Sequence, residues 1–249
     1  MRFNRIFTFI AMIIWGATLF GFNFRDGERL VFDIKYGVIS AGEATMNIEK
    51  VEYNEQPAWR IHSTANTNSF FDKVFKVRDL IESVATYDNL YSLRFTKRMQ
   101  EGSYRQHRIH LNYLSQNFSI YSRFSYKDGV FNDSRVEIAS NTFDILSAFY
   151  YSRTIDLIPG ETTEINVTTD GKNYTAGIKV LRYETIETMF GKRKCIVIRP
   201  LLDGEAIFKQ TDNIDIWLLD DEYRTPVLMS SKIIFGSFKA SLKKVEITK

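Results

Sequence analysis

Apolar and polar residues alternate along most of the chain beyond residue 28, and this pattern predicts β-strands. In RLVFDIKYGV, the apolar residues Phe32, Ile34, Tyr36 and Val38 occupy every second position. A period of two places such side chains on one face of a half-buried strand. The same pattern recurs in segments 44–48, 59–65, 93–95, 109–113 and 118–120. Repeated strands at this spacing predict a mainly antiparallel β protein with about ten to thirteen strands.

Asp-Gly pairs separate several of these strands and predict tight turns. They occur at 26–27, 128–129, 170–171 and 203–204. Both residues tolerate the positive φ angles that short hairpins require, so INVTTDGKNYTAGIKV is predicted to be a hairpin. In IIFGSFKA, Gly236 and Ser237 fit a two-residue turn that would place Phe235 opposite Phe238.

Helical periodicity is scarce. SNTFDILSAFYYSRT predicts a helix over residues 142–154, capped by Asn141 or Thr142 and joining two β-rich halves. Its apolar face would carry Phe143, Leu146, Phe149 and Tyr150. NSFFDKVFK predicts a second, short helix. Because the sequence shows no linker or repeat, residues 23–249 are expected to form a single β-rich domain.

The first 22 residues differ in composition from the rest of the chain. Arg2 and Arg5 precede an uncharged apolar stretch from Ile6 to Phe22. This layout is typical of a secretory signal peptide, with cleavage near residues 17–21, and predicts an exported protein. An uncleaved membrane anchor is the alternative, because about 17 apolar residues are the lower limit for crossing a bilayer. No Cys follows the stretch, which disfavours a lipid-anchored lipoprotein.

Composition excludes some classes of partner and linkage. The net charge of +3 with 25% charged residues gives no reason to expect a nucleic-acid partner for an exported chain. The single cysteine, Cys195, excludes an internal disulfide. It lies in the alternating stretch KCIVIRP and is predicted to be a buried small apolar residue. A catalytic thiol is the alternative reading, and it would need a histidine brought close by the fold.

Candidate catalytic and metal sites are few. IDIWLLDDEYRTP sets Asp220, Asp221 and Glu222 between two strands. Adjacent residues of an extended chain point to opposite faces, so these carboxylates are predicted to belong to a turn rather than to an acid–base pair. His107 and His110 are expected on opposite faces of one strand, which disfavours a metal site. With no familiar catalytic motif, we expect no enzyme activity, no metal and no cofactor.

A basic segment covers residues 94–113, RFTKRMQEGSYRQHRIHLNY. One interpretation is contact with anionic lipid head groups at a membrane surface. The other is a solvated sheet face or edge, where cations discourage unwanted strand pairing. The candidate contact residues are Arg94, Lys97, Arg98, Arg105 and Arg108.

Aromatic residues make up 14% of the chain, with 20 Phe and 13 Tyr. A curled sheet with an apolar helix near its mouth could hold an acyl chain, and aromatic side chains would line such a site. Packing of an ordinary core is the alternative use of the same residues. The candidate lining residues are Phe70, Phe71, Phe143, Phe149, Tyr150 and Trp217.

Several stretches together resemble one protein family. These are FDIKYGVISAGEATMNI, VFKVRDLIESVATYDNLYSLRFTKRMQEGSYR, FDILSAFYYSRTIDLIPGE, GKNYTAGIKVLRYETIETMFGKRKCIVIRP and IWLLDDEYRTPVLMSSKIIFGSFKASL. They are similar to the exported bacterial proteins of domain of unknown function 3108, over residues 28–245. The resemblance implies a long antiparallel sheet that curls around helical elements, like the half-barrels of lipoprotein carriers. It implies no catalytic residue.

Three functions follow as hypotheses. The first is a non-enzymatic envelope protein of a Gram-negative bacterium, periplasmic or associated with the outer membrane, that binds a lipid or an acylated protein inside the curled sheet. An inner-membrane anchor would change its location. The second is an envelope interaction module with a packed interior and partners at its sheet edges or basic segment. The third, an enzyme acting on an envelope polymer, would need carboxylates assembled in a cleft.

Overall fold

The chain folds into one very long, curled β-sheet. The computed structural model describes residues 22–202, 214–233 and 236–248. The strands are β1 (Glu28–Tyr36), β2 (Ile39–Tyr53), β3 (Gln56–Thr67), β4 (Arg78–Thr86), β5 (Ser92–Glu101), β6 (Tyr104–Tyr113), β7 (Phe118–Ser125), β8 (Val130–Glu137), β9 (Thr142–Phe143), β10 (Thr162–Thr169), β11 (Lys172–Thr188), β12 (Gly191–Leu202), β13 (Ile214–Leu219), β14 (Pro226–Ile233) and β15 (Gly236–Ile247). The helical elements are α1 (Ile145–Ser152) and the 3₁₀ turns η1 (Phe71–Lys73) and η2 (Leu114–Gln116).

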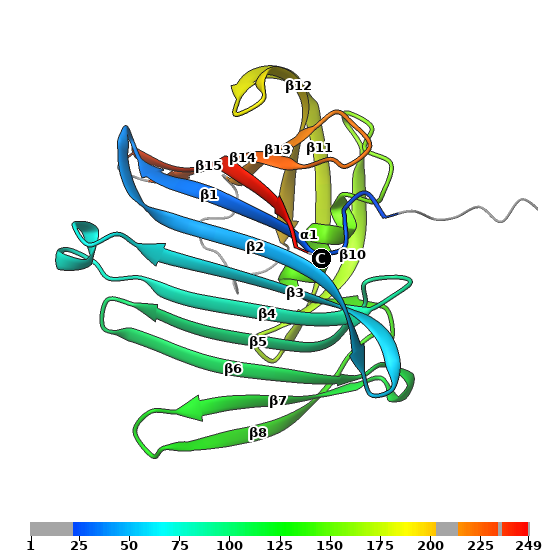
Figure 1. Ribbon diagram of the computed structural model, residues 1–249. Coiled ribbons are helices and arrows are strands. Elements are labelled where there is room, and N and C mark those ends of the chain that lie inside the picture. The colour runs from blue at the N-terminus through cyan, green and yellow to red at the C-terminus, as the bar shows by residue number, and fades with distance from the viewer. Residues whose placement is uncertain (1–21, 203–213, 234–235, 249) are drawn as a thin grey trace, which may run out of the picture.

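The strand order is β8-β7-β6-β5-β4-β3-β2-β1-β15-β14-β13-β12-β11-β10-β9. Neighbours pair antiparallel, except that the short β9 runs parallel to β10. Figure 1 shows the sheet turning so that β10 and β11 stand behind β3 to β6, with α1 between the two arms. No ladder joins β8 to β9 among the described residues, so the sheet is curled but not closed. This confirms the predicted mainly β fold with a large curled antiparallel sheet.

The described sheet has 15 strands, more than the alternation predicted. The difference arises at weakly patterned strands. Almost every side chain of β8 is exposed, so this strand buries no apolar face that an alternating pattern could reveal. Strand β9 is only two residues long. Period-two reasoning detects strands that bury one face, and it therefore misses elements of these two kinds.

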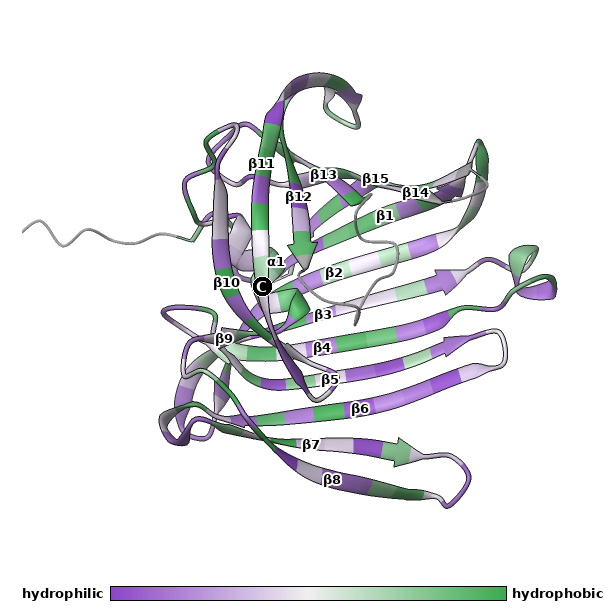
Figure 2. Cartoon of the chain, turned by 180° about the vertical axis from the view of Figure 1, so that it is seen from behind, coloured by the Kyte–Doolittle hydropathy of each residue, from purple (hydrophilic) through white to green (hydrophobic). Residues whose placement is uncertain are grey.

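The core lies on the concave side of the sheet, around α1. Leu30 and Phe32 of β1, Ile48 of β2 and Ile61 of β3 are fully buried there. In Figure 2 the hydrophobic stretches of β4 and β11 lie near α1, whereas β6 is largely polar. The sheet is therefore apolar where it passes the helix and polar towards its β8 end.

The predicted long helix is present but shorter. It occupies Ile145–Ser152, and its N-cap is Asp144 rather than Asn141 or Thr142. Thr142 is unavailable as a cap because β9 pairs it with Asn166 of β10. As predicted, the helix connects two β-rich halves, β1 to β8 and β10 to β15. The second predicted helix is reduced to the single turn η1.

Two turn predictions have different outcomes. Asp221 Oδ1 accepts hydrogen bonds from the backbone N–H groups of Tyr223 (3.0 Å) and Arg224 (2.8 Å), which confirms DDEYRTP as a turn. The predicted Gly236-Ser237 turn is wrong. Gly236 pairs with Ile233 within the β14–β15 ladder, and Gly37 N–H donates to Ser237 O (3.2 Å), so both residues belong to β15. Phe235 and the 203–204 pair lie outside the described residues.

The predicted signal peptide or anchor also lies outside the described residues, apart from Phe22. The ring of Phe22 stacks on that of Phe24 (5.0 Å between centroids) and meets Trp59 edge to face (5.4 Å). The folded region therefore includes Phe22. Among the residues that the structure describes, no helix has the length and apolar character needed to cross a membrane.

Candidate functional site

An apolar cavity of about 220 Å³ lies between α1 and strands β10 to β13. On the helix side it is lined by Ile145, Ala148 and Phe149. On the sheet side its lining includes Ile165, Val167, Ile178, Ile198 and Ile216. The small residues Ala176 and Gly177 of β11 also line it, and their lack of bulk leaves the space open. The cavity offers almost no polar group, so its chemistry suits an apolar guest.

The N-terminus of α1 is fixed by a buried carboxylate. Asp144 Oδ1 accepts from the backbone N–H groups of Leu146 (2.9 Å) and Ser147 (3.0 Å), and Ser83 Oγ of β4 donates to Asp144 Oδ2 (2.6 Å). Burial raises the pKa of Asp144, while these hydrogen bonds act to lower it. The cap therefore ties the helix start to the first half of the sheet.

A buried ion pair fixes the other end. Arg153, fully buried, donates to both carboxylate oxygens of Glu28 on β1 (2.6 and 3.0 Å). Its guanidinium also donates to the backbone oxygens of Tyr223 (2.9 Å) and Asn23 (3.1 Å). Because a bidentate pair has a fixed geometry, α1 is held in one position relative to β1 and the β13–β14 turn. One side of the helix packs on the core and the other faces the cavity.

The six aromatic candidates do not form one cluster. Phe149 lines the cavity. Tyr150 and Phe143 are buried in the core, where Phe143 packs against the rings of Tyr91 (5.2 Å) and Tyr151 (4.7 Å).

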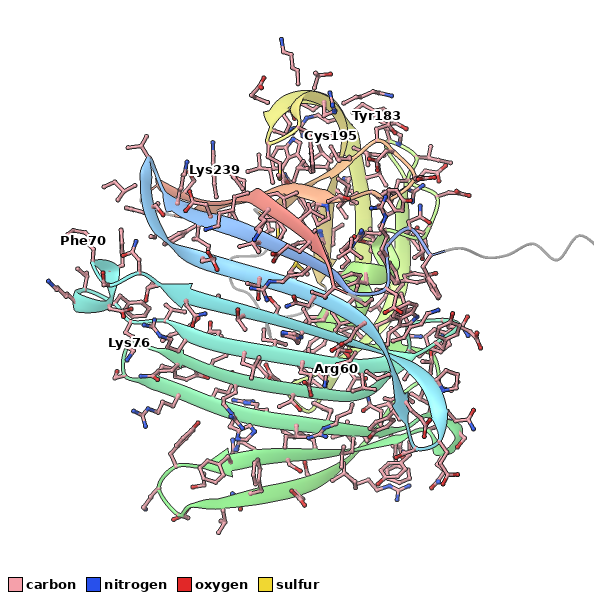
Figure 3. The ribbon with its side chains drawn as sticks, viewed as in Figure 1. Arg60, Phe70, Lys76, Tyr183, Cys195 and Lys239 are labelled. Atoms are coloured by element: carbon pink, nitrogen blue, oxygen red, sulfur yellow. The ribbon has the colours of Figure 1, made fainter. Side chains whose placement is uncertain are left out.

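The remaining three candidates lie away from the cavity. Trp217 is buried, and its indole N–H donates to Glu184 (3.2 Å). Phe70 and Phe71 lie in the β3–β4 loop at the rim of the sheet, as Figure 3 shows for Phe70.

The basic segment 94–113 forms the β5–β6 hairpin, and the alternation of the strands divides its cations. Lys97 and Arg108 pair across the ladder and point into the curl. Arg94 and Arg98 point to the opposite face, and Arg105 is exposed near the turn. The five candidate residues therefore do not make one surface patch.

Inside the curl, the β10–β11 turn rests on a polar cluster. Lys97 Nζ donates to Asp170 (2.8 Å), and Arg108 lies 3.5 Å from the same carboxylate. Gly171 N–H donates to His110 Nε2 (3.1 Å). Gly171 has φ +77°, and a Cβ there would come within 2.8 Å of the Tyr121 ring. The predicted Asp-Gly turn is thus present, and it also connects the two arms of the sheet.

His110 is neutral at ordinary pH. Burial lowers its pKa to about 4; the Asp170 carboxylate acts to raise it, while Lys97 and Arg108 act to lower it. Since Nε2 accepts from Gly171, the ring proton lies on Nδ1, which is 3.0 Å from Ser119 Oγ. His110 is therefore a fixed structural residue of the polar cluster.

Other chemically active groups are separated from one another. Within the described ranges, no group of His, Cys, Asp and Glu could hold a metal ion. Cys195 is fully buried, as predicted, and burial raises the pKa of its thiol to about 11. Asp220 pairs with Lys194 (2.6 Å), while Asp221 forms its turn, so the two carboxylates share no proton. Burial raises the pKa of Asp79 to about 6.

Sequence reasoning missed most of the cavity. Ile145, Ala148 and Phe149 share a helix face at spacings of three and four, a signal that the sequence contains. Nothing in the pattern indicates that a second face of α1 would lie over the apolar residues of β11 and β13, because that contact depends on the curl. The polar cluster depends on the same long-range geometry.

The comparisons with known proteins agree with the fold. A family model described as "Protein of unknown function (DUF3108)" matches residues 31–243. No curated protein matches the sequence. The crystal structure of a β-barrel-like protein of domain of unknown function DUF1849 from Brucella abortus is similar, with a TM-score of 0.52 and 10% identity. The match covers 89% of this chain and 98% of that one, and at this identity the likeness concerns the fold alone.

Proposed function

Because the chain belongs to the DUF3108 family of proteins of unknown function, we propose a function from its own cavity: it binds one hydrophobic chain between α1 and strands β10 to β13, without catalysis. The guest would be a lipid tail or the acyl group of a modified protein. The apolar cavity is the observation that carries this proposal.

The physical properties of the cavity support an apolar guest. A smaller engineered cavity of about 150 Å³ with an apolar lining stays dry and takes up benzene. At about 220 Å³, this cavity has room for a short stretch of alkyl chain. The lining would exclude a charged head group, because a buried charge needs a partner. The head group would therefore remain outside while the tail is inside.

We place this activity in the cell envelope. The layout of Arg2, Arg5 and the apolar stretch Ile6–Phe22 supports export. Lipid tails and acylated proteins are available in that compartment. Whether the first segment is removed or stays as an anchor decides if the protein diffuses or remains at a membrane.

One observation favours the second hypothesis, an interaction module. Sites for drug-sized ligands have volumes of about 300–1,000 Å³, and this cavity is smaller. In that case the cavity is a packing defect of the curled sheet, and function lies at the surface.

Intact mass separates the two functions. We would express the full-length chain in a Gram-negative host, purify it from the envelope and compare native with denatured masses. Binding predicts a native mass that exceeds the denatured mass by the mass of a lipid. The denatured mass also reports whether the first segment was removed. A native mass without this increment, also after incubation with envelope lipids, would favour the interaction module.

Filling the cavity tests the location of the guest. Ala148→Leu and Ala176→Leu each add three carbons to its lining, so we expect the bound increment to decrease sharply while the protein still folds. Ala65→Leu adds the same atoms to half-buried β3, away from the cavity, and should keep the increment. A guest that persists in both cavity variants would mean that it binds elsewhere.

A further inference from the structure

Apolar side chains are exposed at the turns along one rim of the sheet. We use "turn rim" for the β1–β2, β3–β4, β5–β6 and β7–β8 turns, residues 36–39, 68–77, 102–105 and 126–131, which lie together at the left of Figure 1. Val38 is 93% exposed, Val74 76% and Phe70 65%. Tyr104, Tyr126 and Val130 are also exposed there. Apolar side chains gathered on one edge make that edge a candidate interaction surface.

The β3–β4 loop holds its apolar residues outward by a fixed structure. Asn68 Oδ1 accepts from the backbone N–H groups of Phe70 (3.1 Å) and Phe71 (3.0 Å). Asp72 pairs with Arg78 (2.6 Å), which closes the loop. Because the backbone is fixed in this way, Phe70 and Val74 cannot reach the core without breaking these bonds.

The turn rim carries more free cations than free acids. Lys73, Lys76, Arg105 and Lys127 are exposed, and no ion pair of theirs occurs among the described residues. Of the acids nearby, Asp72 binds Arg78 (2.6 Å), whereas Asp128 only accepts a hydrogen bond from Ser125 Oγ (2.6 Å) and keeps its charge, and Glu101 borders the β5–β6 turn. Figure 3 shows Phe70 and Lys76 on the same rim of the sheet. Unpaired cations therefore outnumber unpaired acids around the apolar tips.

The opposite ends of the same strands provide an internal comparison. The β2–β3 turn presents Asn54 and Glu55, the β4–β5 turn presents Asp88, and η2 presents Ser115 and Gln116. These exposed residues are polar or acidic. Exposed apolar side chains also occur elsewhere, such as Tyr113 at this end and Met189 and Phe190 at the β11–β12 turn. The three most exposed large apolar side chains, Val38, Val74 and Phe70, all belong to the turn rim.

We propose that the turn rim docks on a lipid bilayer surface that contains anionic lipids. Binding to a membrane surface requires two contributions: apolar side chains that enter the interface, and cations that contact anionic head groups. The turn rim offers both. The tips lie on four separate turns instead of lining a groove, so a fluid surface suits them better than a shaped protein. A second copy of the rim is disfavoured because its cations would repel each other. The proposal does not depend on the cavity.

Co-sedimentation with vesicles tests the proposal. We would compare the full chain on phosphatidylcholine vesicles with and without phosphatidylglycerol, and expect binding that needs the anionic lipid and weakens with salt. Lys73→Glu with Lys76→Glu should lower the partition coefficient by about tenfold or more. Phe70→Ser with Val74→Ser should also lower it. All variants share the same N-terminal segment, so differences between them belong to the rim.

Exposed lysines elsewhere give the matched control. Lys179→Glu with Lys192→Glu makes the same charge change on β11 and β12, away from the rim, and should change partition by about twofold at most. Equal losses in rim and control variants would overturn the proposal. Dimers of the wild-type chain that the rim variants abolish, measured by sedimentation velocity, would also overturn it by making the rim a self-interface.

A fluorescent label tests the orientation, even if the first segment itself holds the chain on the vesicle. Val38→Cys labels the turn rim, and Ser115→Cys labels the opposite end. The native Cys195 is fully buried with a raised thiol pKa, so it should not compete. We expect the emission to shift to the blue on anionic vesicles for the first label alone. A shift of both labels, or of neither, contradicts docking by this rim.

Discussion

One buried histidine contributes to the pH dependence of this protein's stability. His110 is buried beside Lys97 and Arg108 and accepts a hydrogen bond from Gly171 N–H. Its pKa is lowered to about 4, from an ordinary value of 6.5. As the pH falls from 6.5 towards 4, His110 becomes protonated in the unfolded chain but stays neutral in the folded protein. The contribution of His110 to the free energy of unfolding is therefore fully present above pH 6.5 and is lost as the pH falls towards 4.

We expect this loss to be about 2–3 kcal/mol between those two pH values. His110→Gln should remove it, because the amide oxygen can accept from Gly171 without titrating. The measurement is the free energy of unfolding in denaturant at several pH values. Burial also lowers the pKa of the more exposed His107, so His107→Gln should change the profile in the same direction but less. Asp79 has a raised pKa, so its contribution to the free energy of unfolding changes with pH in the opposite direction. The quantity to compare is therefore the difference in the free energy of unfolding between wild type and His110→Gln at each pH. An unchanged pH profile in His110→Gln would contradict this role.

Residues whose roles are local were predictable from the sequence. The strand position of Cys195 predicted its burial, and the Asp-rich turn at 220–222 follows from local hydrogen bonding. The partners of Arg153 and Asp170 could not be predicted in this way, because they lie 125 and 73 positions away in the sequence. Long-range ion pairs leave no pattern in a single sequence.

At the scale of elements, α1 depends on the buried pair that holds its end. Arg153→Met should lower the free energy of unfolding by about 3–5 kcal/mol, because it leaves Glu28 buried without a partner. Chemical denaturation at neutral pH measures this. The double variant Glu28→Gln with Arg153→Met should recover part of the loss, since the unpaired charge is gone. Arg60→Met is the matched control, because its pair with Glu49 is exposed and should contribute less than about 1 kcal/mol.

Element boundaries show the limit of local reasoning. The helix was predicted at the right place, yet its first residues form β9 because Thr142 and Phe143 pair with β10. The β14–β15 register was predicted from the preference of Gly-Ser for turns. The structure keeps those residues in β15, where Gly236 pairs with Ile233 and Ser237 with Lys232 of the adjacent β14. Pairing with a distant strand therefore sets the first boundary, and the register of the hairpin itself sets the second.

At the scale of the whole molecule, the contact of the β10–β11 turn with β5 and β6 maintains the curl of the open sheet. Asp170→Asn removes the carboxylate shared by Lys97 and Arg108. We expect the arms to separate, with a larger radius of gyration in solution scattering and faster hydrogen exchange at Gly171 N–H. Asp220→Asn removes an exposed pair with Lys194 and should change neither quantity. An unchanged radius in Asp170→Asn would mean that α1 alone sets the curl.

Strand order has a consequence for how the chain acquires its structure. β1 and β15 are neighbours in the middle of the sheet, so residues from the two ends of the sequence join its halves. During synthesis, β1 has only one of its two neighbouring strands until residues 236–247 are made. The chain therefore spends that interval as two unjoined halves with open central edges, exposed to aggregation. A chaperone that protects the β1 edge would act during this interval, before the two halves join.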